Sequence, residues 1–278
     1  MGTNLVRHFI ITRFNLRAPG PTGALQVDER YLDARMELFE RFCLPSVRSQ
    51  TRQDFKWLVL FAEDTPATFR ARIERLAEWP VFVPVYISAG TEHVGRLVVA
   101  PHLDGSPQTL VTTRLDNDDG LCRTYVEDIR RHVDVRERTV LQFPRGYVWH
   151  RGRIYLDRQE HNAFATLVEP LARGADSQYV TIYKGSHSDL DRLGPVIDVG
   201  DEPGWLQVIH GGNAENFVRG SRRPIGELAR RFDIALPDAA DDETSAGIYL
   251  DRARVLATST STRLIRSLKS RLARARSP

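Results

Sequence analysis

The stretch TLVTTRLDNDDGL, residues 109–121, joins a short β-branched run to three closely spaced carboxylates. Residues 109–113 predict a buried strand, because β-branched and apolar residues favour strands. Asp116, Asp118 and Asp119 follow within four positions, where their like charges repel one another. This crowding indicates a site for a cation at the carboxyl end of a strand.

Similar strands precede this one along the chain and alternate with amphipathic helices. We expect strands at 6–12, 55–62 and 82–87, and helices at 31–47, 66–79 and 122–132. The alternation predicts an α/β fold with a mainly parallel sheet flanked by helices. Ligands of such sheets bind beyond the carboxyl ends of the strands. The loops after 6–12 and 109–113 both lie at such ends.

The pattern changes after residue 138. Apolar and polar residues alternate over 139–158 around a turn at Arg151-Gly152, which predicts antiparallel strands. We also expect a helix at 162–171, a strand at 204–210, an acidic linker at 235–244 and a basic helical tail at 246–278. The chain therefore divides into three predicted parts, 1–137, 138–234 and 235–278.

Composition limits the classes of protein. The 278 residues are 41% hydrophobic and 27% charged with a net charge of +3, which predicts an ordered globular chain and no nucleic-acid partner. Cys43 and Cys122 lack the spacing of a zinc site or a disulfide framework, so a reducing cytoplasm is expected. No stretch approaches the roughly 20 apolar residues of a membrane span.

The aspartate cluster has three interpretations. Asp118 or Asp119 could cap the next helix, which explains one aspartate but not three. An EF-hand loop requires glycine at its sixth position, and Gly120 comes one place early. The third interpretation is a D-x-D motif, Asp116-Asn117-Asp118, whose hard oxygen ligands suit Mn²⁺ or Mg²⁺ bridging to substrate phosphates. We favour the D-x-D interpretation.

Two arginines also lie at predicted strand ends. Arg13 follows the first strand and Arg114 follows the fourth. A guanidinium can pair with phosphate through two hydrogen bonds, which favours nucleotide binding. An ion pair with the aspartates is the alternative for Arg114, and the two roles are compatible.

Several ordered blocks carry a family resemblance. RHFIITRFNLR, FERFCLPSVRSQT, FKWLVLF, TTRLDNDDGL and WLQVIHGGN resemble the bacterial family of putative rhamnosyltransferases, over roughly residues 7–217. That family is similar to GT-A-type glycosyltransferases. The resemblance implies a Rossmann-like nucleotide half, a smaller antiparallel acceptor half and transfer from a nucleotide sugar.

The resemblance implies roles for individual residues. Asp116 and Asp118 match the metal-binding motif, with Asp116 also near the nucleotide. Thr12, Arg13 and Phe14 fall where such enzymes hold the base and ribose. Asp64 is a further nucleotide contact, with a solvated loop as its alternative. His210, the last residue of a predicted strand, matches the late histidine that often completes the metal site, with packing at a strand end as its alternative.

An inverting transfer needs a general base for the acceptor hydroxyl. We favour Glu160, which precedes a predicted helix, and keep Asp189, in a polar loop, as the second candidate. The predicted acceptor contacts are Trp149, Trp205 and Asn213. The two tryptophans are candidates because aromatic faces stack on sugars, although a core role is equally compatible for them. The acceptor class expected is a glycan or glycolipid.

The donor expected is a nucleotide sugar, dTDP-linked if the sugar is rhamnose, otherwise UDP- or GDP-linked. A nucleotidyltransferase and a non-catalytic glycan- or partner-binding protein are the competing functions. Residues 262–278 are basic and amphipathic as a helix, which predicts peripheral contact with the inner face of the cell membrane. A helix docked on the protein is the alternative for this tail.

Overall fold

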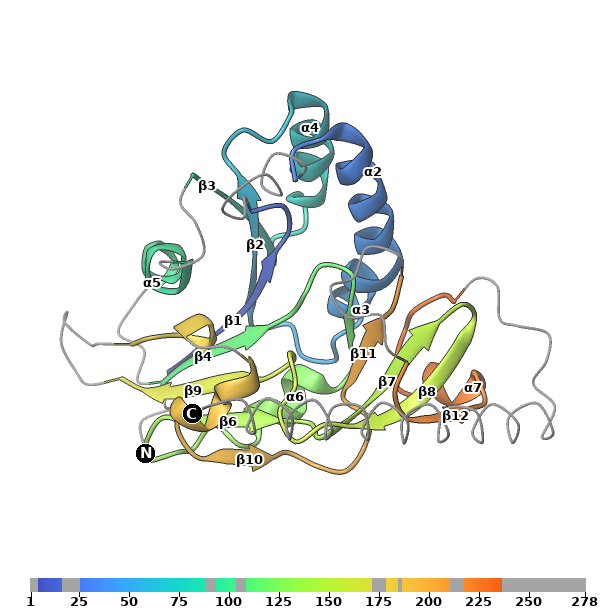
Figure 1. The fold of residues 1–278 in the computed structure, drawn as a ribbon. Helices are drawn as coiled ribbons and strands as arrows, with labels where there is room; N and C mark the ends of the chain where they lie inside the picture. Colours follow the sequence, from blue (N-terminus) through green and yellow to red (C-terminus); the bar gives the residue numbers. More distant parts are fainter. Residues whose placement is uncertain are drawn as a thin grey trace, which may run out of the picture.

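The computed structural model describes residues 5–16, 26–88, 94–103, 109–171, 179–184, 187–210 and 218–236. These residues form two sheets that meet beside a long helix (Figure 1). Asn213 and the tail 262–278 lie outside the described residues.

The larger sheet has seven strands in the order β10-β6-β9-β4-β1-β2-β3. They are β1 (Val6–Arg13), β2 (Lys56–Ala62), β3 (Phe82–Ile87), β4 (Thr109–Arg114), β6 (Thr139–Gln142), β9 (Thr166–Pro170) and β10 (Val196–Asp198). β1 pairs in parallel with β2 and β4, and β2 with β3. The predicted mainly parallel sheet is confirmed, and it places the carboxyl ends of β1 and β4 side by side.

The smaller sheet has the order β12-β8-β7-β11-β5. Its strands are β5 (Gly120–Leu121), β7 (Arg145–His150), β8 (Arg153–Arg158), β11 (Trp205–Val208) and β12 (Ser221–Arg223). All its pairings are antiparallel except β7 with β11. Arg151 (φ 49°) and Gly152 (φ 75°) form the predicted turn, in the left-handed conformation that two-residue hairpin turns require.

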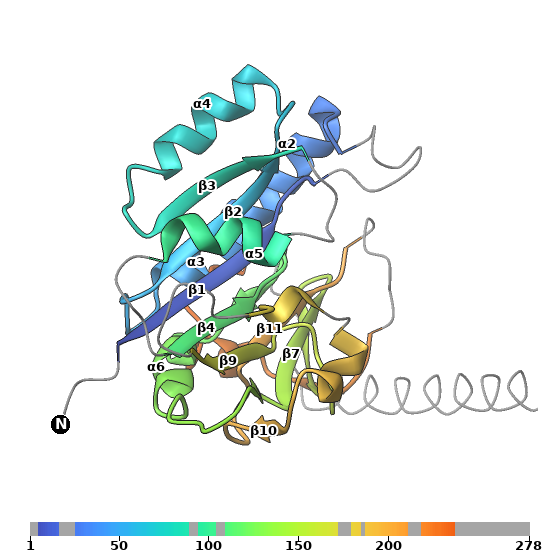
Figure 2. The same cartoon turned by 90° about the vertical axis from the view of Figure 1, so that its left-hand side faces the viewer.

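Helices cover both faces of the larger sheet (Figures 1 and 2). The helical segments are α2 (Glu29–Leu38), the π-helical turn η1 (Phe39–Cys43), α3 (Leu44–Arg48), α4 (Ala67–Leu76), α5 (Val94–Val99), η3 (Ala100–His102), α6 (Tyr125–Arg130), η4 (Ile182–Lys184), η5 (His187–Arg192) and α7 (Gly226–Ala229). The segments α2, η1 and α3 run on as one helix, begun by Asp28, whose carboxylate accepts from Arg30 N and Tyr31 N. Within the described residues, no helix is both long and apolar enough to cross a bilayer.

One predicted element is wrong. Residues 162–171 were expected to form a helix, but 166–170 are the strand β9, inserted antiparallel between β4 and β6. Both Leu167 and Val168 are fully buried, so successive residues are apolar on both faces of the strand. A strand of this kind shows no alternation of apolar and polar residues, so its sequence cannot be distinguished from that of a short buried helix.

The boundary expected at residue 137 does not separate the two sheets. β6, β9 and β10 lie after it and join β1–β4, while β5 lies before it and joins the smaller sheet. The chain thus passes between the sheets more than once, and the functional division into a donor half and an acceptor half stays a prediction.

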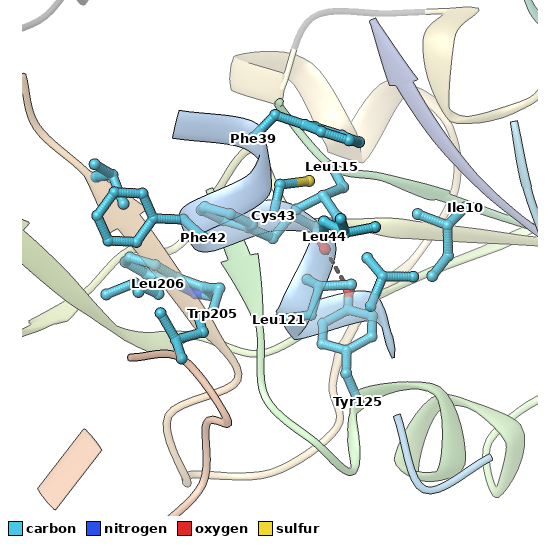
Figure 3. Packing of buried hydrophobic residues seen from close by; sticks show 14 of the residues in the cluster. Ile10, Phe39, Phe42, Cys43, Leu44, Leu115, Leu121, Tyr125, Trp205 and Leu206 are labelled. Atoms are coloured by element: carbon cyan, nitrogen blue, oxygen red, sulfur yellow. Dashed lines mark hydrogen bonds between the residues drawn. The ribbon is translucent and has the colours of Figure 1, made fainter. Parts of the chain in front are cut away.

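The main core lies between the long helix and both sheets (Figure 3). Phe39, Phe42 and Cys43 of the π-helical turn meet Leu115 and Leu121 there, and all five are fully buried. Leu115 and Leu121 flank the three aspartates. Burial of both leucines therefore fixes the chain on either side of Asp116, Asp118 and Asp119.

Candidate functional site

The aspartate loop, residues 115–119, connects β4 of the larger sheet to β5 of the smaller one. Leu115 N donates to Ile11 O at 3.1 Å, and Asp119 N donates to Asp116 O at 3.3 Å. The loop is therefore tied to β1 and closed by its own turn, so the carboxylates have defined directions.

Asp118 is the most strongly engaged aspartate of the loop. Its Oδ2 atom lies 2.8 Å from Arg35 Nη1 and 2.8 Å from His210 Nε2, and its side chain is 9% exposed. Burial alone would raise the pKa of Asp118, but the hydrogen bond with His210 and the positive charge of Arg35 outweigh burial and lower it. Asp118 is thus an ionised carboxylate held between two cationic or basic groups.

Asp119 fixes the loop to the strand that carries His210. Its buried Oδ1 atom accepts from Val208 N of β11 at 2.8 Å. Burial and the neighbouring charges of Asp118 and Asp116 raise the pKa of Asp119 well above its usual value. The bond to β11 explains how a histidine 92 positions later in the chain reaches Asp118.

Asn117, between the two motif aspartates, connects the aspartate loop to two other segments of the chain. Its Nδ2 donates to Phe14 O at 2.8 Å, and its Oδ1 accepts from Arg35 Nη1 at 3.3 Å. The amide therefore links the loop after β1 to helix α2 through its two ends.

Asp116 faces a different set of side chains from Asp118. Its Oδ1 atom lies 3.6 Å from Arg114 Nε, and its side chain is 35% exposed. The guanidinium carbons of Arg13 and Arg114 lie 5.2 Å and 5.6 Å from the centre of the Tyr183 ring. The two aspartates of the D-x-D motif thus belong to two adjoining clusters, Asp116 with Arg114, and Asp118 with Arg35 and His210.

The side chains around Asp118 are compatible with a divalent metal ion that takes most of its ligands from water and substrate. Within the described part of the chain, no three His, Cys, Asp or Glu side chains converge as a metal cage. Asp118 and His210 supply one oxygen and one nitrogen ligand already in contact. Mg²⁺ commonly uses one or two carboxylates together with water and substrate phosphates, so this small set fits such an ion.

Two of the predicted nucleotide contacts have side chains in the core. Thr12 is fully buried, and its hydroxyl accepts from Trp57 Nε1 at 2.9 Å. The Phe14 ring is 4% exposed and packs against Phe39 and Phe61. Asp64 is exposed in the loop after β2.

The tryptophans predicted to contact the acceptor occupy different environments. Trp205 is fully buried, stacked on Phe164 with ring centres 5.0 Å apart, and donates to Phe143 O. Its ring is a core side chain with no exposed surface to offer an acceptor. Trp149 is only partly buried and lies opposite Val208, at the end of the smaller sheet that Asp119 reaches.

The two predicted general bases lie in different segments of the chain. Glu160 is exposed beyond the end of β8 that pairs with Arg145, whereas Trp149 is near the other end of β7. The backbone oxygen of Glu160 accepts from Gln142 Nε2 of β6, which holds Glu160 at the larger sheet. Asp189, in η5, is partly exposed and pairs with Arg192 at 3.9 Å.

Sequence reasoning missed Arg35 and Tyr183. Arg35 lies next to Met36 on the amphipathic helix α2, and an arginine there resembles a solvated surface residue. Tyr183 belongs to a short 3₁₀ turn with no periodic pattern. The signal available for Arg35 was charge alone, because three crowded aspartates need cations nearby.

A family model described as "Putative rhamnosyl transferase" matches residues 10–222. The chain belongs to this family. Membership places it in the glycosyltransferase class. No curated protein matches the chain.

Solved structures with partial similarity include TarS of S. aureus. TarS 1-349 has a TM-score of 0.42 at 8% identity over 73% of this chain, and its complex with UDP-GlcNAc has 0.43 at 9% over 77%. The chain spans 60% and 62% of those two structures. The inositol-1-phosphate CTP transferase of T. maritima has a TM-score of 0.33 at 12% identity, over 73% of this chain and 89% of that one.

Proposed function

We propose that this chain is a metal-dependent, inverting glycosyltransferase that moves a sugar from a nucleotide-sugar donor to a glycan or glycolipid acceptor. The observation that carries the proposal is the 2.8 Å contact between Asp118 Oδ2 and His210 Nε2. It joins the second aspartate of the D-x-D motif to the late histidine that the family resemblance assigned to the same metal. Family membership supports the transfer of a sugar.

Asp118 and His210 would hold Mn²⁺ or Mg²⁺ in this proposal. When bound, such an ion neutralises charge on a departing diphosphate and orients it. Arg35 keeps Asp118 ionised and fixed in direction through its 2.8 Å contact. Asp119 keeps β11, and with it His210, at the correct distance through its bond to Val208 N.

The donor would lie across the carboxyl ends of β1 and β4. Arg13, Arg114 and Asp116 meet there, and Asp116 is the most exposed of the three aspartates. The family name favours rhamnose as the sugar, with dTDP as its carrier, and UDP and GDP remain the alternatives. TarS has been solved with UDP and with UDP-GlcNAc, which supports a nucleotide-sugar donor of this general kind.

The acceptor would approach from the smaller sheet. Trp149 has a partly buried ring beside Phe42, and its buried Nε1 has no hydrogen-bond partner in the described structure. Glu160 and Asp189 both stay candidates for the general base, Glu160 held at Gln142 of β6 and Asp189 in η5.

The direct test is release of nucleoside diphosphate from dTDP-, UDP- and GDP-linked sugars, with Mn²⁺, Mg²⁺ or a chelator present. We expect release from one donor class, dependent on metal and reduced about a hundredfold or more in Asp118→Asn. Asp54→Asn is the matched control, because Asp54 forms a surface ion pair with Arg52. Equal release by wild type and Asp118→Asn would contradict the assignment.

The tail 262–278 lies outside the described residues, so its role rests on sequence. We propose that its six lysines and arginines bring the enzyme to anionic membranes, where a glycolipid acceptor would be found. Deleting 262–278 should reduce co-sedimentation with vesicles containing anionic lipid. Unchanged co-sedimentation would reject the membrane role.

A further inference from the structure

Arg13, Arg114 and Tyr183 form a cluster at the carboxyl ends of β1 and β4. The Tyr183 ring centre lies 5.2 Å from the Arg13 guanidinium carbon and 5.6 Å from that of Arg114. Tyr183 is the aromatic residue that both arginines share, and it comes from η4, far from either strand in sequence.

The strand register puts both arginines on one face of the sheet. Arg114 is the register partner of Ile11, so their side chains share a face. Arg13 comes two residues after Ile11 and points to the same face. Tyr183 lies over this face, because it packs against the core cluster that contains Ile11, and its hydroxyl donates to Ile11 O at 3.0 Å.

Three contacts hold Tyr183 in place. The buried carboxylate of Glu169 accepts from Val180 N and Thr181 N, each at 3.0 Å. Ile182 N donates to Thr112 Oγ1 of β4 at 2.9 Å. Thr181 has a positive φ of 62°, which is strained for a β-branched residue and persists only where the surroundings enforce it. The segment before Tyr183 is therefore fixed to the sheet, and the ring with it.

Arg114 keeps hydrogen-bonding capacity that the described side chains do not use. Arg114 is 12% exposed at its side chain, and its buried Nε has no hydrogen-bond partner in the described structure. The nearby carboxylate of Asp116 lies 3.6 Å from this nitrogen, beyond a normal hydrogen bond. Two guanidiniums thus lie against one aromatic ring, with the Asp116 carboxylate beside Arg114, an arrangement suited to an anion with several oxygen atoms.

We propose that Arg13 and Arg114 bind the phosphate groups of the donor and that Tyr183 is a positioning residue that fixes both guanidiniums for this task. This inference rests on the proposed function and names the part of the donor that the cluster recognises. Tyr183 acts through the two arginines, by stacking with them and by filling the space between η4 and the sheet. The phosphate site is thus built from three separate segments of the chain, β1, β4 and η4.

The test is isothermal titration calorimetry with UDP, dTDP and GDP, each beside its own nucleoside, on the full chain. With the diphosphate that binds wild type best, Tyr183→Leu should weaken affinity about tenfold, because two cation–π contacts are lost. Affinity for the nucleoside alone should change less than twofold. Tyr183→Phe keeps the ring and should bind the diphosphate within about threefold of wild type.

Trp79→Leu is the matched control, because it removes a comparable contact, with Arg48 at 5.5 Å, elsewhere on the protein. It should leave diphosphate affinity unchanged. Equal losses of nucleoside and diphosphate affinity in Tyr183→Leu, or wild-type affinity for both, would overturn the inference while leaving the donor assignment intact. Failure of the wild-type protein to bind any of the three diphosphates would overturn the proposed function as well.

Discussion

His210 Nε2 and Asp118 Oδ2 lie 2.8 Å apart, although the two residues are separated by 92 positions in the chain. The contact is set by the bond between Asp119 and Val208 N, which fixes the aspartate loop to the strand just before His210. Two motifs that are unremarkable alone, a D-x-D and a histidine after a strand, thereby become one site.

Replacing either motif aspartate should stop sugar transfer. Asp116→Asn and Asp118→Asn remove one negative charge each while keeping the side-chain size, so the fold should persist. We expect nucleoside diphosphate release to fall about a hundredfold or more in both, measured beside circular dichroism spectra. Activity near wild type in both variants would reject the D-x-D assignment.

Replacing His210 should change the metal requirement rather than the fold. His210→Ala leaves Asp118 paired with Arg35, so the loop should stay in place. We expect the Mn²⁺ concentration for half-maximal activity to rise about tenfold or more, as metal-site substitutions commonly cause. An unchanged metal titration would make His210 a structural partner of Asp118.

Removing Arg35 should destabilise the protein and disturb the site together. Arg35→Met leaves Asp118 with only 9% of its side chain exposed and without its guanidinium partner. The free energy of unfolding should fall by about 2–3 kcal/mol, because Asp118 keeps only His210 as a partner and losing one member of a buried ion pair is costly. Denaturant-induced unfolding measures this change in free energy. The control is Arg30→Met, because Arg30 is an exposed arginine of the same helix. Equal stability of the two variants would show that Arg35 contributes little.

His8 predicts a dependence of stability on pH. It is buried in β1, and its Nε2 lies 2.8 Å from Thr113 Oγ1. Burial and the charge of Arg130 lower its pKa from 6.5 to about 3. The unfolded chain therefore binds a proton at His8 between pH 6.5 and about 3 that the folded protein excludes.

The stability contributed by neutral His8 is present above pH 6.5 and is lost as the pH falls towards 3. The loss should be about 1.4 kcal/mol for each pH unit in this window. Urea unfolding at pH 6, 5 and 4 should approach this slope, and His8→Gln should reduce it. A slope unchanged in His8→Gln would assign the pH dependence to other groups.

The strands and the loop were predictable because their signals are local. Runs of β-branched and other apolar residues predict β1 to β4, and the aspartates follow the last of these strands directly. β9 was not predictable, because Leu167 and Val168 are buried on opposite faces and leave no alternation. Arg35 and Tyr183 reach the site only through tertiary packing, and Trp205 was misleading because a buried tryptophan and a sugar-binding one look alike in sequence.

The central claim is that Asp118 and His210 hold a metal that holds the diphosphate of the donor. The most direct measurement is a thermal-shift series with UDP, dTDP and GDP, each with and without Mn²⁺, on wild type and Asp118→Asn. A ligand at a hundredfold excess over its dissociation constant stabilises the native state by about 2.7 kcal/mol. We predict a shift with one nucleotide that grows with Mn²⁺ in wild type and loses its metal dependence in Asp118→Asn. The same shift with and without metal, or in both proteins, would contradict the claim.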